Sequence, residues 1–300
     1  MALVLVGLCC RADNAGVTSF VRVLNFSGQA YHRFLHLFHS TSLDLDVLTS
    51  CWVRLCLVLF HPFEVHSRLV CLADGIKAPK EGRRMPGVKY LHQQSASNTK
   101  PQYIMGHSLQ AISLLVHSGV GQVAAVPLTS RIHEGLVFSN RDARTLLDKL
   151  VALLFSIARA WDRKVLLVAD AYYASGKVIT PLLANGHQLL TRAKSNAVAY
   201  LPVPQAAHRG KGRPKIYGNK VRLKDLAQDD SAFICAPSPV YGERDVTVRY
   251  RVLDLMWRPV GRIMRFCIVH HPVRGTIFLL STDTALQPLQ MLELYGYRFK

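Results

Sequence analysis

Acidic residues are scarce in this sequence. Its 300 residues include 19 Asp and Glu against 37 Lys and Arg, which gives a formal net charge of +18 at neutral pH. An excess of this size says little about fold, but it favours polyanionic partners, nucleic acid before a membrane surface. A contribution to solubility alone is the other explanation. Because half of the residues are apolar, the chain can bury a substantial core and is not expected to be disordered.

Cysteine motifs and long apolar runs are also missing. The seven cysteines form no Cys-x-x-Cys pair and have no histidine at zinc-finger spacing, so neither a disulfide framework nor a structural zinc site is expected. Most lie in apolar runs, such as Cys51 and Cys71, where a small buried side chain is the simplest interpretation. Their odd number suits a reducing cytoplasm. The apolar start at 1–8 is too short for a bilayer, and charged residues interrupt 43–63, so no membrane span is expected.

Apolar periodicity separates the first two regions of the chain. Residues 1–66 have apolar side chains at three- and four-residue intervals, typical of helices; this region either binds DNA ends or packs on the core. Residues 67–197 alternate between short apolar runs and helical patterns. The elements expected there are strands at 68–73, 103–116, 122–128, 165–169 and 187–192 and helices at 142–161 and 175–184. This order predicts an α/β fold with a mixed sheet and flanking helices, beginning with a three-stranded antiparallel meander.

The last two regions have different sequence patterns. Residues 198–276 begin with a Pro- and Gly-rich basic stretch and continue with strand-like segments at 246–253 and 261–269, which predicts a β-rich basic insertion. Residues 277–300 return to the core through a short strand. A helical pattern then begins at about Leu286 and continues to Lys300, so the last helix is expected to run to that point.

Two segments share one form, an apolar strand followed by an aspartate. Leu72-Ala73-Asp74 and Val168-Ala169-Asp170 would each present a carboxylate at the end of a buried strand, and in a mixed sheet such strands can be neighbours. Two nearby carboxylates repel each other unless a cation neutralises them, and Mg²⁺ and Mn²⁺ prefer oxygen ligands. Asp74 and Asp170 are therefore the candidate catalytic and metal-binding residues, holding two divalent ions for phosphodiester displacement. For either aspartate alone, a turn or helix-cap role is the alternative.

These motifs resemble those of a known family. The chain is similar to bacterial insertion-sequence transposases of the DDE type, in the class with a ribonuclease H-like catalytic core and a Tyr-x-x-Arg-x-x-x-Glu signature. Asp74 and Asp170 match the first and second aspartates of the family, and Tyr295 and Arg298 match the Tyr-x-x-Arg part. The resemblance covers about residues 67–300 and includes a β-rich region inserted before the last helix.

The resemblance implies cut-and-paste transposition. Two Mg²⁺ or Mn²⁺ ions would assist the attack of water at the transposon end, and the freed 3′-hydroxyl would then attack target DNA. Tyr295 and Arg298 would hold the phosphate backbone. The implied partner is double-stranded DNA, both transposon ends and target, in a bacterial or archaeal nucleoid. A homodimer in the DNA complex is one option.

The third carboxylate of the signature falls two residues after Lys300, outside this sequence. Glu293 is the nearest carboxylate, but it precedes Tyr295 and is interpreted as a solvent-facing helix residue. A polypeptide of residues 1–300 is therefore expected to cleave DNA poorly. Two alternatives remain: a non-catalytic remnant that binds transposon ends or inhibits a full-length transposase, and a nuclease of the same fold that acts on RNA or repair intermediates.

Two basic segments are expected to contact DNA phosphates with little sequence readout. Their residues are Lys77, Lys80, Arg83 and Arg84 in the first segment and Arg209, Lys211, Arg213 and Lys215 in the insertion. The second segment includes a Gly-Arg-Pro that resembles a minor-groove hook, although a solvated loop explains it equally well. Trp257 is interpreted as a packed core residue and the pair His270 and His271 as structural.

Overall fold

The chain divides into two compact units, Met1–Trp52 and Val53–Lys300. The computed structural model describes residues 2–13, 16–80, 82, 85–93, 101–119, 121–133, 144–203 and 215–299. None of the helices in these ranges has the length and apolar character that are needed to cross a bilayer.

The first unit is helical, as the periodicity predicts. It contains α1 (Ala2–Cys10), α2 (Val17–Val23), α3 (Gly28–His39) and the beginning of α4 (Leu45–Leu59). The buried side chains of Val4, Phe20 and Phe34 form its small core, in which the two phenylalanine rings meet edge to face with centroids 6.2 Å apart.

The helical prediction for residues 1–66 is wrong at its end. After α4 the chain forms two short strands, β1 (His61–Pro62) and β2 (Glu64–Val65). Proline lacks an N–H and disfavours the helical conformation in the residue before it, so Pro62 prevents α4 from continuing. The interpretation of the cysteines is confirmed for Cys71, which is buried, and wrong for Cys51, which is exposed.

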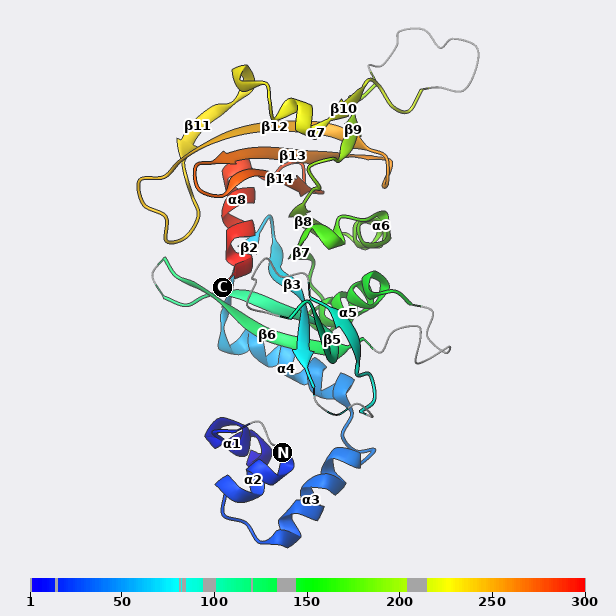
Figure 1. Ribbon diagram of the computed structural model, residues 1–300, viewed down its shortest axis with the longest axis vertical. Coiled ribbons are helices and arrows are strands. Elements are labelled where there is room, and N and C mark those ends of the chain that lie inside the picture. Colours follow the sequence, from blue (N-terminus) through cyan, green and yellow to red (C-terminus); the bar gives the residue numbers. More distant parts are fainter. Residues whose placement is uncertain are drawn as a thin grey trace. The chain divides into compact units, whose positions relative to one another are not determined.

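The central strands of the second unit have the predicted mixed arrangement (Figure 1). Strand β3 (Arg68–Pro79) pairs in parallel with β7 (Val165–Val168), which pairs in parallel with β8 (Gln188–Arg192). On its other side β3 is antiparallel to β5 (Tyr103–His117), and β5 is antiparallel to β6 (Val123–Ile132). The predicted antiparallel meander is thus confirmed. The order β6–β5–β3–β7–β8, with its parallel centre, confirms the predicted ribonuclease H-like mixed sheet.

Strand β3 is longer than its apolar run predicts. Its parallel pairing with β7 stops at Leu72 and Val168, but its antiparallel pairing with β5 continues to Pro79. Asp74 and Lys77 therefore lie within the strand, and not at its end or in a loop. The continuation depends on a long-range partner, β5, which also pairs with β4 (Lys89–His92).

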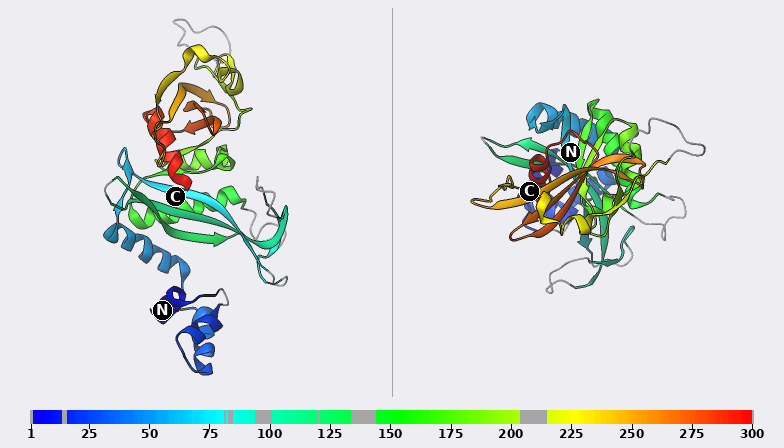
Figure 2. Two further views of the ribbon diagram at one scale, coloured as in Figure 1. Left: turned by 60° about the vertical axis from the view of Figure 1, so that its left-hand side comes forward. Right: turned by 90° about the horizontal axis from the view of Figure 1, so that it is seen from above.

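Helices cover both sides of the central strands (Figures 1 and 2). Helix α5 (Leu146–Trp161) begins at Thr145, whose hydroxyl and the carboxylate of Asp148 form a capping box. The predicted helix start at Asp142 lies outside the described residues. Helix α6 (Gly176–Ala184) follows β7 and lies on the same side as α5, whereas α8 (Pro288–Gly296) lies on the opposite side.

The β-rich insertion extends the central sheet and does not form a separate one. Its elements are β9 (Val198–Tyr200), β10 (Lys220–Arg222), α7 (Leu223–Leu226), β11 (Ile234–Pro237), β12 (Thr247–Trp257) and β13 (Arg262–His271). Strand β14 (Gly275–Ser281) pairs with β13 on one side and β8 on the other, which makes the sheet continuous. The interpretation of Trp257 as a core residue is confirmed, because only 7% of it is exposed. His270 and His271 are structural as predicted, since they hydrogen-bond to Thr276 and Glu243.

The last helix is shorter than predicted. Helix α8 ends at Gly296, and Tyr297–Phe299 form a single 3₁₀ turn. Glycine is a poor helix former, which favours a change of conformation at this point. Glu293 is half-buried on α8, and its carboxylate accepts a hydrogen bond of 2.7 Å from the hydroxyl of Tyr297.

Candidate functional site

Asp74 in β3 and Asp170 just after β7 occupy equivalent positions relative to the parallel pairing of these strands, and Asp170 is also the N-cap of the 3₁₀ turn Ala171–Tyr173. The last parallel pair between β3 and β7 is Leu72 with Val168, and each aspartate follows two residues later. Side chains along a strand alternate between faces, so each aspartate continues the face of the leucine or valine before it. Leu72 and Val168 belong to the core cluster that also contains Tyr295 of α8. The two carboxylates therefore emerge at the edge of the face that α8 covers.

One guanidinium connects both carboxylates. The Arg298 NH2 nitrogen lies 3.2 Å from Asp74 Oδ1 and 3.8 Å from Asp170 Oδ2. These two oxygens can be no farther apart than the sum of 3.2 and 3.8 Å, which is 7.0 Å. The structure thus brings together three residues that the sequence places far apart, and it places a positive charge where two negative charges converge.

The surroundings of Arg298 keep it charged and oriented. Its side chain is 13% exposed. Burial alone lowers the pKa of a guanidinium, but Tyr295, Asp74 and Asp170 outweigh burial, and the pKa of Arg298 is raised. Its NH1 donates to the hydroxyl of Tyr295 at 3.1 Å, and the guanidinium carbon lies 5.8 Å from the centre of the Tyr295 ring. The Tyr-x-x-Arg spacing places one side chain against the other.

Both carboxylates remain accessible to a ligand. The side chain of Asp74 is 53% exposed and that of Asp170 is 37% exposed. Backbone N–H groups orient them: Gly75 donates to Asp74 Oδ1 and Tyr172 donates to Asp170 Oδ1, each at 2.9 Å. Two accessible carboxylates so close together form a donor set that fits Mg²⁺ or Mn²⁺. Within the described ranges, no group of three His, Cys, Asp or Glu side chains has an arrangement that could hold a metal ion.

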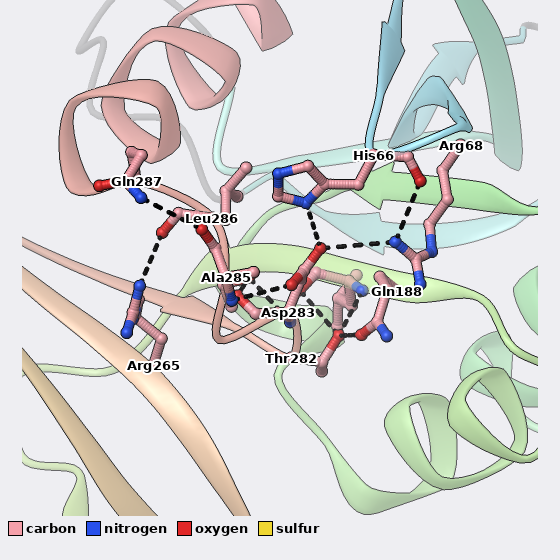
Figure 3. Close-up of polar contacts among 11 residues, drawn as sticks. His66, Arg68, Gln188, Arg265, Thr282, Asp283, Ala285, Leu286 and Gln287 are labelled. Atoms are coloured by element: carbon pink, nitrogen blue, oxygen red, sulfur yellow. Dashed lines mark hydrogen bonds and ion pairs between the residues drawn. The ribbon is translucent and has the colours of Figure 1, made fainter.

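A polar network fixes the loop that leads into α8 (Figure 3). Asp283 Oδ2 lies 2.9 Å from His66 Nδ1 and 3.5 Å from Arg68 NH1, while its Oδ1 accepts from the N–H of Ala285 at 3.0 Å. Burial would raise the pKa of Asp283, but these partners outweigh it, and the pKa is lowered. Because His66 and Arg68 belong to the turn and strand that precede Asp74, the network ties the start of α8 to β3.

A cavity of about 520 Å³ opens beside the carboxylates. Asp74 and Asp170 line it together with Lys77, Gln110 and Tyr172, among others. Lys77 is held at its wall, because Nζ donates to the backbone oxygen of His92 at 2.6 Å. The cavity therefore joins two carboxylates, an ammonium group and neutral polar side chains in one space.

Tyr173 also lines this cavity and is almost fully buried. Its hydroxyl donates a short hydrogen bond to Gln110 Oε1. Burial raises the pKa of Tyr173 above its usual range, and the nearby charges of Asp170 and Asp74 raise it further. Tyr173 therefore remains a neutral hydroxyl.

Comparison with known protein families matches residues 1–251 to the family described as DDE superfamily endonuclease. The chain belongs to this family. The matched region contains both Asp74 and Asp170, and it ends before Tyr295 and Arg298. Enzymes of the DDE superfamily generally use divalent metals and act on DNA. A comparison with curated proteins found no match.

Only some of the residues that are predicted to contact DNA lie in the described part of this DDE-family chain. Lys77 lines the cavity, and Lys80 and Lys215 are exposed. Five further candidates lie outside the described residues, namely Arg83, Arg84, Arg209, Lys211 and Arg213. Sequence analysis did not single out Gln110 or Asp283 as part of the site, because Gln110 lies in the middle of an apolar strand and the partners of Asp283 are distant in the chain.

Proposed function

We propose that this chain is a DDE transposase that acts on the ends of an insertion sequence through metal-dependent phosphodiester cleavage and strand transfer. The observation that carries the proposal is the convergence of Asp74 and Asp170 from neighbouring parallel strands on one cation, Arg298. Membership of the DDE endonuclease family supports it. The net charge of +18 agrees with a DNA substrate.

Each residue has a part that follows from its position. Asp74 and Asp170 would hold two divalent ions, Mg²⁺ or Mn²⁺, which when bound activate an attacking oxygen and stabilise the leaving oxygen. Arg298, released from the carboxylates, would bind a backbone phosphate next to the scissile bond, and Tyr295 would hold its guanidinium in place. Lys77, Lys80 and Lys215 would contact other phosphates without sequence readout.

A second candidate function is DNA binding without cleavage. Arg298 contacts both Asp74 and Asp170, so its guanidinium competes with a metal ion for these carboxylates. If the guanidinium were not displaced, the chain would bind transposon ends, or inhibit a full-length transposase through mixed oligomers, with little cleavage of its own.

The test compares Asp74→Asn and Asp170→Asn with the unchanged chain on plasmid DNA that carries the flanking inverted repeats. In a version lengthened to carry the third carboxylate, each substitution is expected to lower Mn²⁺-dependent cleavage at least about 100-fold while DNA binding stays within about twofold. Asp225→Asn, on the exposed surface of α7, removes the same charge away from the site and is the matched control. Equal cleavage by both variants and the control would show that the site is wrongly assigned. Tight binding with no cleavage in any version would support the second candidate.

A further inference from the structure

The cavity beside the carboxylates has a hydrogen-bond donor that no other described group uses. Gln110, on β5, is 4% exposed and lines the cavity. Its Oε1 accepts from the hydroxyl of Tyr173, which fixes the amide so that Nε2 is the free end. Within the described residues, Nε2 has no hydrogen-bond partner. The described side-chain atoms that are both fully buried and without a partner do not include Nε2, so this donor is accessible from the cavity. A ligand that places an acceptor there can take its hydrogen bond.

An aromatic face and a cation complete the cavity. Tyr172 lines it and is 55% exposed, although large aromatic side chains are usually buried. Its ring meets that of Tyr173 edge to face, with centroids 5.5 Å apart. Lys77 Nζ, fixed by the backbone oxygen of His92, adds a positive charge to the wall. An aromatic surface, a cation and a donor of fixed direction are the elements that bind a base and its phosphate.

The volume of the cavity limits the size of the ligand that it can hold. A space of about 520 Å³ is in the range of pockets that enclose one small molecule, and a DNA duplex is much too large for it. Enzymes that act on DNA commonly move a nucleotide out of the stack into such a pocket. The position of the cavity against Asp74 and Asp170 makes that nucleotide a neighbour of the phosphate to be cut.

We propose that this cavity binds one unpaired nucleotide of the DNA strand, stacked on Tyr172, and that the Nε2 amide of Gln110 selects a base with a carbonyl oxygen at C4 of a pyrimidine or C6 of a purine. Thymine, uracil and guanine present an acceptor where cytosine and adenine present an amino group, which would oppose the donor. Gln110 is thus a specificity-determining residue. The proposal rests on the proposed function, in that the cavity serves the strand that the carboxylates cleave.

The test measures binding without any divalent metal, so that cleavage plays no part. Fluorescein-labelled oligo(dU) and oligo(dC) of 12 nucleotides are titrated with the 1–300 chain, and Kd is obtained from fluorescence anisotropy. The two oligonucleotides have the same charge and similar size, so non-specific electrostatic attraction cancels in the ratio of their Kd values. Oligo(dU) is expected to bind about three- to tenfold more tightly, the effect of one hydrogen bond.

Two sets of variants locate the effect. Gln110→Glu keeps an acceptor for Tyr173 and removes the donor, so the ratio is expected to fall to about one or to invert. The double variant Gln110→Leu with Tyr173→Phe removes both partners together and guards against a misfolded single variant. Tyr172→Ala is expected to weaken both oligonucleotides about fivefold or more with an unchanged ratio, whereas Tyr172→Phe keeps the stacking surface and the affinity.

Equal affinities of the unchanged chain for oligo(dU) and oligo(dC) would overturn the proposal, as would an unchanged ratio in Gln110→Glu. The outcome is separate from that of the proposed function. A clear base preference with no metal-dependent cleavage would refute only the transposase activity. Cleavage that depends on Asp74 and Asp170, without a base preference, would refute only the nucleotide cavity.

Discussion

Removal of a positive charge from the site is expected to strengthen the binding of a positive metal ion. Arg298 contacts both carboxylates that would hold the metal, so an incoming ion must displace the guanidinium before it can bind. In Arg298→Ala this competitor is gone. We therefore expect Mn²⁺ to bind the DNA-free Arg298→Ala chain more tightly than the unchanged chain.

The size of the effect follows from the contacts of Arg298. Hydrogen bonds to charged groups contribute about 1.5–3 kcal/mol when they are shielded from water. Here NH2 lies 3.2 Å from Asp74 Oδ1, but the side chain of Asp74 is 53% exposed, and solvent screening reduces the interaction to about 1–1.5 kcal/mol. At about 1.4 kcal/mol for each factor of ten, Mn²⁺ affinity should rise about five- to twelvefold.

Isothermal titration calorimetry with Mn²⁺ measures this affinity directly. Arg262→Ala, an exposed position at the start of β13, removes one positive charge elsewhere and shows how much of the change is due to net charge alone. Arg298→Lys keeps the charge near the carboxylates and is expected to stay within about threefold of the unchanged chain. An equal or weaker affinity in Arg298→Ala would refute the competition between guanidinium and metal.

Two further predictions concern stability. Asp283→Asn should lower the free energy of unfolding by about 1–2 kcal/mol at pH 7 in urea titrations, because it removes the ion pair with Arg68 and weakens the hydrogen bond with His66. Since the pKa of Asp283 is lowered from 3.8 in the folded state, its contribution is fully present above 3.8 and is lost as pH falls through the folded pKa. The two proteins should therefore begin to converge only below pH 3.8. Leu167→Ala, at a fully buried position in β7, should cost about 2–5 kcal/mol, whereas Val273→Ala, 86% exposed, should change stability by less than about 0.5 kcal/mol.

Local pattern was sufficient for much of the fold. The apolar stripe of α5 predicts a helix because one face of this helix is buried. The four-residue apolar run of β7 predicts a strand because both faces of this strand are buried. The length of β3 could not be predicted, because its second half, including Lys77, is held by pairing with β5 and not by its own apolar residues. The end of α8 was missed for a similar reason, since the periodicity continues beyond Gly296 while the backbone changes to a 3₁₀ turn.

The part of the site that could be predicted is the pair of carboxylates that each follow a strand-like apolar run. Asp74 and Asp170 both follow short apolar runs, and the parallel register of β3 and β7 then places them side by side. The contact between Arg298 and these carboxylates could not be predicted, because it depends on the packing of α8 against the sheet and on the turn that follows. Gln110 was missed because the role of a polar residue inside an apolar strand depends on a hydrogen-bond partner that is distant in the sequence. Here that partner is Tyr173.

The position of Arg298 also implies that metal and DNA assist each other. If the guanidinium is bound by the carboxylates in the free chain and by a phosphate in the DNA complex, then Mn²⁺ releases it for DNA, and DNA releases the carboxylates for Mn²⁺. Such coupling is reciprocal, so DNA should bind more tightly in the presence of Mn²⁺ by the same factor that Mn²⁺ gains from DNA. Simple neutralisation of Asp74 and Asp170 by the ion would also tighten DNA binding, but it would do so in Arg298→Ala as well. The coupling is measured as the ratio of DNA Kd values with and without Mn²⁺. Loss of most of the coupling in Arg298→Ala would show that the guanidinium causes it. Full retention of the coupling in Arg298→Ala would show that charge neutralisation causes it.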